Sequence, residues 1–198
     1  MIDAIERAAT AARRGRLIVL PTDTVYGIGT RPDDPDATAR LFEAKGRPSE
    51  LTVPVLVPTT SAAREVGVFD ERAEALALRF WAGPLTIVVP RGPASADWAL
   101  GGDPSTVGVR MPHHPLALAV LARTGPLAVT SANVSSEPTP STCEGVEQVF
   151  GDRVDVYLCE AEPLEGRAST VVDLAHGEPR ILRVGTVTED QVLAALRG

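Results

Sequence analysis

The sequence contains few of the residues on which several common kinds of site depend. Aromatic side chains make up only 4% of the 198 residues, so we expect no stacking surface for single-stranded nucleic acid. Of three histidines, His113 and His114 are adjacent and point apart, while His176 is remote, so no protein metal site is expected. No G-x-x-x-x-G-K-[ST] segment occurs, which excludes a P-loop.

Export and membrane signals are also lacking. Segment 1–16 mixes acids with bases and has no apolar core, and no apolar run approaches the roughly 20 residues that span a bilayer. The two cysteines, Cys143 and Cys159, form no C-x-x-C pair. We therefore expect a cytoplasmic protein with two reduced thiols. The net charge of −7 argues against general nucleic-acid binding but leaves room for a local basic surface.

Helical and strand patterns alternate along the chain. Helices are expected at 2–14, from Pro35 to Gly46, and at 60–66, 70–81, 116–123, 144–150 and 188–196. Strands are expected at 17–20, 53–57, 86–89, 107–111, 127–130, 154–158, 170–174 and 180–184. Pro54 interrupts the second of these strands, which favours an edge position for it.

This alternation predicts one α/β domain over residues 1–198, with helices on both faces of a mixed, twisted sheet. Long loops are expected at 91–106, 134–142 and 160–168. Loops of this length inside a compact domain are often lids or binding loops.

The first strand is followed by a polar segment at 21–30, PTDTVYGIGT, which we expect to be a loop. Ligands of open α/β sheets bind at the carboxyl ends of strands. Hydroxyls from Thr22, Thr24 and Tyr26 suit a small zwitterion or a sugar phosphate. The same groups could equally satisfy the backbone of a turn.

Two cations flank the glycine that ends the second helix. Lys45 and Arg47 could simply complement the helix dipole. Alternatively, Arg47 could clamp a phosphate or carboxylate while Lys45 acts as a mobile point charge. Ser131 and Asn133 follow the strand at 127–130, where they could form a turn or offer a hydroxyl and an amide to a ligand.

Arginines also lie on predicted strands. Arg110 ends the strand at 107–111, and Arg183 lies within the strand at 180–184 without a local acid. Because a guanidinium group does not lose its proton, each must meet an anion if it is buried.

Taken together, these segments resemble the YrdC family, the L-threonylcarbamoyladenylate synthases, over nearly the whole chain. The pairing of K-x-R with S-x-N is typical of that family. The matching segments are PTDTVYGIG at 21–29, LFEAKGRP at 41–48, PVLV at 54–57, FWAGPLTIVV at 80–89, VGVRMPHHP at 107–115, TSANVS at 130–135, STVVD at 169–173 and ILRVG at 181–185.

The resemblance implies a concave, basic cleft and a reaction that joins L-threonine, bicarbonate and ATP, with Mg2+, into threonylcarbamoyl-AMP and pyrophosphate. A partner transferase would then modify the adenosine at position 37 of certain tRNAs, and a weak contact with RNA is compatible with this role. The resemblance further implies a short form that lacks the extra C-terminal domain of longer relatives.

The resemblance also assigns roles to residues. Lys45 and Arg47 would be catalytic. ATP would be bound by Lys45, Arg47, Ser131, Asn133, Ser169 and Arg183. Threonine would be bound by Thr22, Thr24, Tyr26, Arg47, Arg110 and Thr130. A solvent-excluding lid is expected at 160–168. Ser136 stands where the family usually has glycine, which puts the geometry of that loop in question.

Two other functions remain open from the sequence. One is a double-stranded RNA-binding or ribosome-maturation module that uses the same concave surface. The other is a carbamoyl-transfer domain of the same fold that uses carbamoyl phosphate.

Overall fold

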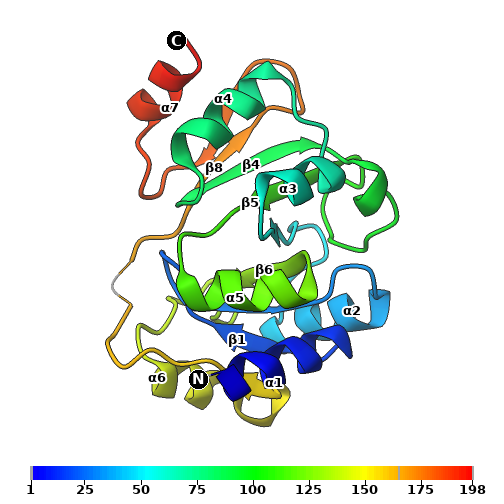
Figure 1. Ribbon diagram of the computed structural model, residues 1–198, viewed down its shortest axis with the longest axis vertical. Helices are drawn as coiled ribbons and strands as arrows, with labels where there is room; N and C mark the ends of the chain where they lie inside the picture. Colours follow the sequence, from blue (N-terminus) through cyan, green and yellow to red (C-terminus); the bar gives the residue numbers. More distant parts are fainter. Residues whose placement is uncertain (1, 165, 198) are drawn as a thin grey trace.

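The computed structural model describes residues 2–164 and 166–197, which form one mixed nine-stranded sheet and seven α-helices (Figure 1). The helices are α1 (Ile2–Arg13), α2 (Pro35–Lys45), α3 (Thr60–Val66), α4 (Glu71–Phe80), α5 (Pro115–Thr124), α6 (Cys143–Phe150) and α7 (Glu189–Ala195). The strands are β1 (Ile18–Leu20), β2 (Gly27–Thr30), β3 (Val55–Leu56), β4 (Leu85–Pro90), β5 (Thr106–Arg110), β6 (Leu127–Ser131), β7 (Val156–Tyr157), β8 (Thr170–Asp173) and β9 (Arg180–Arg183).

The strand order is β7-β1-β2-β6-β3-β5-β4-β8-β9. Three pairs, β1 with β7, β3 with β5 and β4 with β8, are parallel, and the other five are antiparallel. The predicted mixed α/β sheet is therefore confirmed. No helix among residues 2–164 and 166–197 is long and apolar enough to cross a membrane.

Two predictions about strands are wrong. β3 lies in the middle of the sheet rather than at an edge, because it begins after Pro54, whose carbonyl accepts a hydrogen bond from the amide of Val129 at 3.0 Å. Residues 27–30 form strand β2 rather than a loop. Glycine permits this close pairing: a Cβ at Gly29 would lie 2.5 Å from the carbonyl oxygen of Ala128.

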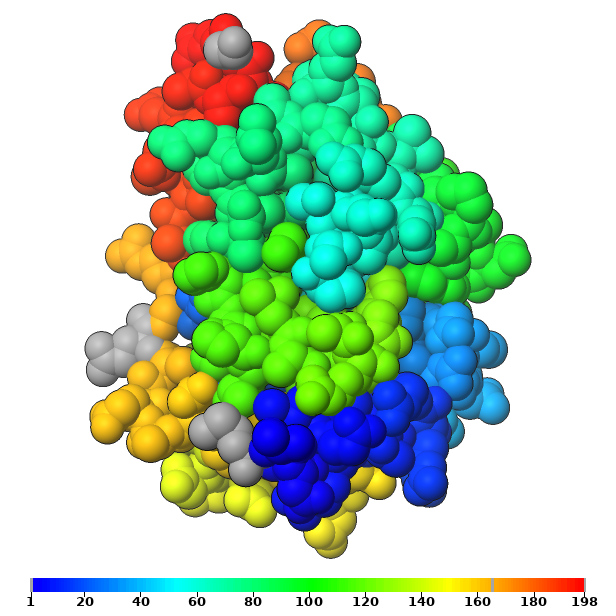
Figure 2. Space-filling view, viewed as in Figure 1, coloured from blue at the N-terminus to red at the C-terminus, as the bar shows by residue number. Residues whose placement is uncertain are grey.

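Two apolar clusters hold the helices against the sheet. The smaller cluster joins α1 and α5 to β1, β3 and β6, and it includes Ile18 and Leu20. The larger one includes the intervening Val19, so it lies on the other side of β1, where α2 and α6 pack. Figures 1 and 2 show α1 and α5 side by side in one continuous surface.

The ends of α2 carry residues that are typical helix caps. The side chain of Asp34 accepts hydrogen bonds from two amides of the first turn, with Pro35 at the first helical position. Gly46 closes the helix with φ at 55°, in the left-handed region. These two caps fix where α2 begins and ends. They therefore place Lys45 as its last residue and Arg47 just beyond it.

Candidate functional site

A cleft of about 490 Å3 opens on one face of the sheet. Along β4 and β5 its wall is made by Thr86 and Gly108, which alternate with the buried core residues Ile87 and Val109. The period of two therefore gives these two strands one face in the core and one face in the cleft. Nine of the residues assigned from the sequence line the cleft: Thr22, Thr24, Tyr26, Arg47, Arg110, Thr130, Ser131, Ser169 and Arg183.

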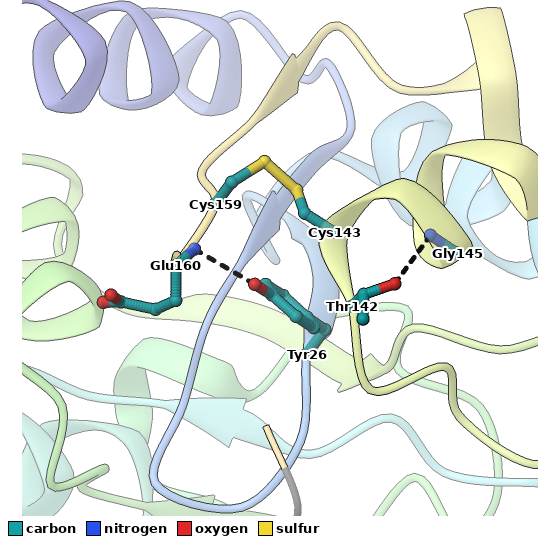
Figure 3. The surroundings of a disulfide bond; sticks show 6 residues. All are labelled: Tyr26, Thr142, Cys143, Gly145, Cys159 and Glu160. Atoms are coloured by element: carbon teal, nitrogen blue, oxygen red, sulfur yellow. Dashed lines mark hydrogen bonds between the residues drawn. A yellow bond between two sulfur atoms is a disulfide. The ribbon is translucent and has the colours of Figure 1, made fainter. Parts of the chain in front are cut away.

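The segment between β1 and β2 forms one wall of the cleft. The hydroxyls of Thr22 and Thr24 lie 2.9 Å apart, and Thr22 also donates to the carbonyl of Val25 at 2.6 Å. Tyr26 is fully buried, and its hydroxyl accepts the backbone N–H of Glu160 at 3.0 Å (Figure 3). Thr22 thus stabilises its own turn, while the turn as a whole presents hydroxyls to the cleft.

Arg110 is fixed in the same wall by a buried ion pair. Its Nη2 lies 2.6 Å from Oδ1 of Asp23, Nη1 donates to the hydroxyl of Thr24 at 3.0 Å, and Nε donates to the carbonyl of Gly83. Burial lowers the pKa of Arg110, and the charge of Asp23 opposes that change. Asp23 was not assigned from the sequence, and its position inside the PTDTVYG segment was the available signal.

Two further guanidinium groups face the cleft without a carboxylate partner among the described residues. Arg47 donates to the carbonyls of Leu51 and Thr52, at 3.1 and 2.8 Å. Arg183 donates to the carbonyl and hydroxyl of Ser169, at 3.0 and 3.1 Å. Burial lowers the pKa of Arg47, and the nearby charge of Arg183 lowers it further. Because the like charges of Arg47 and Arg183 repel each other, a bound anion is favoured between them.

Lys45 and Asn133 do not line the cleft, although both were assigned to ATP. Lys45 is 1% exposed, and its ammonium group donates to the backbone carbonyls of Ser131 and Asn133. It is therefore not the mobile point charge that its place at a helix end suggested. The amide of Asn133 donates to the carbonyls of Val134 and Glu137, both at 2.8 Å.

A histidine with two aspartate partners also lines the cleft and was not assigned from the sequence. His176 lies 2.8 Å from Asp173 and 3.0 Å from Asp103. These contacts raise the pKa of His176, chiefly through the hydrogen bond to Asp173. Within the described part of the chain, no group of three or more His, Cys, Asp or Glu side chains is arranged to hold a metal ion.

The expectation of two reduced thiols is wrong for this structure. Cys143 at the start of α6 and Cys159 after β7 form a disulfide, with their Cα atoms 5.4 Å apart (Figure 3). They are 16 residues apart in the sequence, at the two ends of the stretch that contains α6 and β7. The bridge lies next to Glu160, whose amide contacts Tyr26.

The segment expected to be a lid begins at this bridge and reaches the site. At Gly166 the backbone lies against the loop of β1–β2, since a Cβ there would lie 1.7 Å from the carbonyl oxygen of Thr24. The segment then delivers Ser169, whose hydroxyl lies 2.9 Å from that of Thr86. Residue 165 of the expected lid lies outside the described residues.

Comparisons with known proteins agree on one family. The Sua5, YciO and YrdC family model, described as telomere recombination, matches residues 10–185. A Mycobacterium tuberculosis protein, provisionally named a threonylcarbamoyl-AMP synthase, is 43% identical over 97% of this chain and 88% of its own length. The threonylcarbamoyl-AMP synthase of Bacillus subtilis is 36% identical over 97% of this chain, which spans 56% of that protein.

Solved structures show the same fold. Pyrococcus abyssi Sua5 complexed with L-threonine has a TM-score of 0.87 and 34% identity over 96% of this chain and 56% of its own. Escherichia coli YciO, at 24% identity, also has a TM-score of 0.87, and it is matched over 97% of this chain and 94% of its own. From the family-model match and these relatives together, the chain belongs to the Sua5/YciO/YrdC family.

Proposed function

We propose that this chain is an L-threonylcarbamoyl-AMP synthase, which joins L-threonine, bicarbonate and ATP into threonylcarbamoyl-AMP and pyrophosphate. The observation that carries the proposal is the convergence of Arg47, Arg110 and Arg183 on one cleft beside the hydroxyls of Thr22 and Thr24. A ligand with a carboxylate, a hydroxyl and phosphates matches this set of donors. Further support comes from curated relatives of that name at 36–37% identity and from the threonine complex of Sua5.

Threonine binds at the wall made by the β1–β2 segment in this proposal. Arg110 remains fixed by Asp23 and Gly83 and turns its remaining N–H groups toward the threonine carboxylate. Thr24 and Thr130 contribute hydroxyls, and Tyr26 supports the loop from inside the core. Because these groups are already ordered by the protein, little entropy is lost when threonine binds.

The nucleotide binds on the opposite side, near Arg47, Ser131, Ser169 and Arg183. Arg47 and Arg183 neutralise phosphate charge from positions fixed by backbone carbonyls and by Ser169. The amine of threonine first adds to CO2 with loss of a proton, or condenses with bicarbonate with loss of water, and either route gives a carbamate. A carbamate oxygen then attacks the α-phosphorus of ATP, and pyrophosphate leaves. Such a transfer depends on positioning and charge neutralisation rather than on a protein nucleophile.

Mg2+ enters this scheme with the phosphates of ATP. The ion keeps several waters and needs only one or two carboxylates from a protein. Among the described residues the carboxylates that line the cleft are Glu50, Asp103 and Asp173, and the last two contact His176.

The product is a mixed anhydride that water destroys, so we propose that a partner transferase takes it directly to position 37 of tRNA in the cytoplasm. Segment 160–168, whose Gly166 already lies against Thr24, closes over the site during the reaction. A double-stranded RNA-binding role is not favoured, because the net charge is −7 and a cleft of about 490 Å3 fits a small ligand.

Pyrophosphate release from ATP, with threonine and bicarbonate each omitted in turn, tests the proposal. The synthase requires both, whereas a carbamoyl-phosphate enzyme or an RNA-binding module does not. Arg183→Ala should lower the rate by roughly 100- to 1,000-fold, as expected for a preorganised charge. Arg180→Ala is the matched control, since Arg180 lies on the same strand, is exposed and does not line the cleft. Equal effects of the two substitutions would contradict the assignment.

A further inference from the structure

Two short motifs, K-x-R at 45–47 and S-x-N at 131–133, each place one residue in the cleft and one outside it. Arg47 and Ser131 face the cleft, while their partners Lys45 and Asn133 lie behind its wall. We propose that Lys45 is a positioning residue: it shapes the nucleotide side of the cleft through the backbone at 131–133 and does not touch a phosphate. The identity of the ligand rests on the proposed function, whereas the contacts of Lys45 do not.

Lys45 and the segment after β6 are joined in both directions. The ammonium group donates to the carbonyl of Ser131 at 2.5 Å and to that of Asn133, while the amide of Ser135 donates to the carbonyl of Lys45 at 3.0 Å. Charge-assisted hydrogen bonds of this kind are about twice as strong as neutral ones. The last residue of α2 thus sets the path of residues 131–135.

Asn133 completes the same framework. Its Nδ2 donates to two carbonyls farther along the loop, and its Oδ1 accepts from the hydroxyl of Thr139 at 3.2 Å. The amide of Ala132 donates to the carbonyl of Tyr26 at 2.8 Å. With the backbone held from inside by these groups, the side chain of Ser131 faces the cleft.

The surroundings of Lys45 explain why a lysine occupies this place. Buried carbonyl oxygens need donors, and an ammonium group supplies up to three. No carboxylate forms a salt bridge with Lys45 among residues 2–164 and 166–197. Burial lowers the pKa of Lys45 to about 8, and the charge of Arg47 adds to this effect. Two of the three donors of the ammonium group are thus used on backbone carbonyls of the segment at 131–133.

A positioning role and a phosphate contact predict different effects of substituting Lys45 on the affinities for ATP and adenosine. A residue that touches phosphate affects ATP and not adenosine, whereas a residue that shapes the wall affects both. We would measure binding of ATP and of adenosine by calorimetry for the wild type, Lys45→Met and Arg47→Ala. Lys45→Met should weaken both ligands by a similar factor, at least about tenfold. Arg47→Ala, the matched control, should weaken ATP far more than adenosine.

A selective loss of ATP binding in Lys45→Met would overturn the proposal. Lys45→Gln adds a rescue test, because its amide keeps two N–H donors but no charge. Positioning predicts partial recovery for both ligands relative to Lys45→Met, whereas a phosphate contact predicts recovery for ATP alone.

Hydrogen exchange gives a readout that needs neither ligand nor activity. Amides at 131–139 should lose protection in Lys45→Met and, to a smaller extent, in Lys45→Gln, but not in Arg47→Ala. Unchanged protection in both Lys45 variants would refute the positioning role. If the exchange result holds while no pyrophosphate is released by the wild type, the proposed function fails and the role of Lys45 stands.

Discussion

Reduction of the disulfide should measurably destabilise the fold. The bridge joins Cys143 to Cys159 and closes a loop of 16 residues. In the chain-entropy model a loop of this size restricts the unfolded chain by about 10 cal/mol/K, which is about 3 kcal/mol at 25 °C. For a chain of 198 residues this corresponds to a decrease in Tm of roughly 6–12 °C.

The clean variant is Cys159→Ser, because Cys159 is exposed while Cys143 is buried. Serine at an exposed position changes little besides the bridge. Denaturant unfolding of the wild type, with and without a dithiol reductant, should show a decrease in the unfolding free energy of about 3 kcal/mol on reduction. Untreated Cys159→Ser should match the reduced wild type, and the reductant should not change it further.

Two results would refute this reasoning. One is a reduced wild type, with two free thiols counted by mass spectrometry, that unfolds at the same midpoint as the oxidised protein. The other is a Cys159→Ser variant that is still destabilised by the reductant, since the effect would then come from something other than the bridge.

Three further predictions concern single side chains. Asp23→Asn leaves the buried guanidinium of Arg110 without its counter-charge, so the free energy of unfolding should fall by about 3 kcal/mol in urea titrations, and an unchanged value would argue against the ion pair. Ser136 has φ at 72°, in the left-handed region, so Ser136→Gly should raise the unfolding free energy by about 1 kcal/mol; a decrease in the same titration would contradict the strain. The pKa of His176 is raised in the folded state. The stability that this histidine contributes is therefore complete below its ordinary pKa near 6.5 and is lost as the pH rises through the folded pKa. The Tm difference between wild type and His176→Gln should therefore be small and positive at pH 6 and should shrink on raising the pH, and a difference that grows instead would exclude the contact with Asp103 and Asp173.

Local chemistry could be predicted wherever neighbouring residues decide it. The cap by Asp34 and the left-handed Gly46 were predictable, because a side chain two or three residues away satisfies the first amides and only glycine adopts that φ readily. The unusual backbone at Ser136 was likewise visible as a missing glycine.

Tertiary context decided what local patterns could not. Strand β2, GIGT, has little apolar pattern, and its pairing depends on close contact with β6. β3 became central because neighbours on both sides supply its hydrogen bonds. The disulfide joins residues 16 apart, one at the start of α6 and one after β7, whose approach depends on how α6 and β7 lie in the fold.

The candidate site could likewise be predicted only in part from the sequence. The nine assigned side chains that line the cleft were indicated by the resemblance to a known family, because by residue type alone the hydroxyls and guanidinium groups could equally have stabilised turns or a helix end. The amino-acid sequence could not say which way each side chain points. Only the approach of the last residue of α2 to the end of β6 turned Lys45 toward buried carbonyls and left Arg47, two residues later, in the cleft. The sequence alone determined the chemical groups and the alternation of helices and strands, and the tertiary structure decided which of those groups face a ligand, because facing depends on contacts between segments far apart in the chain.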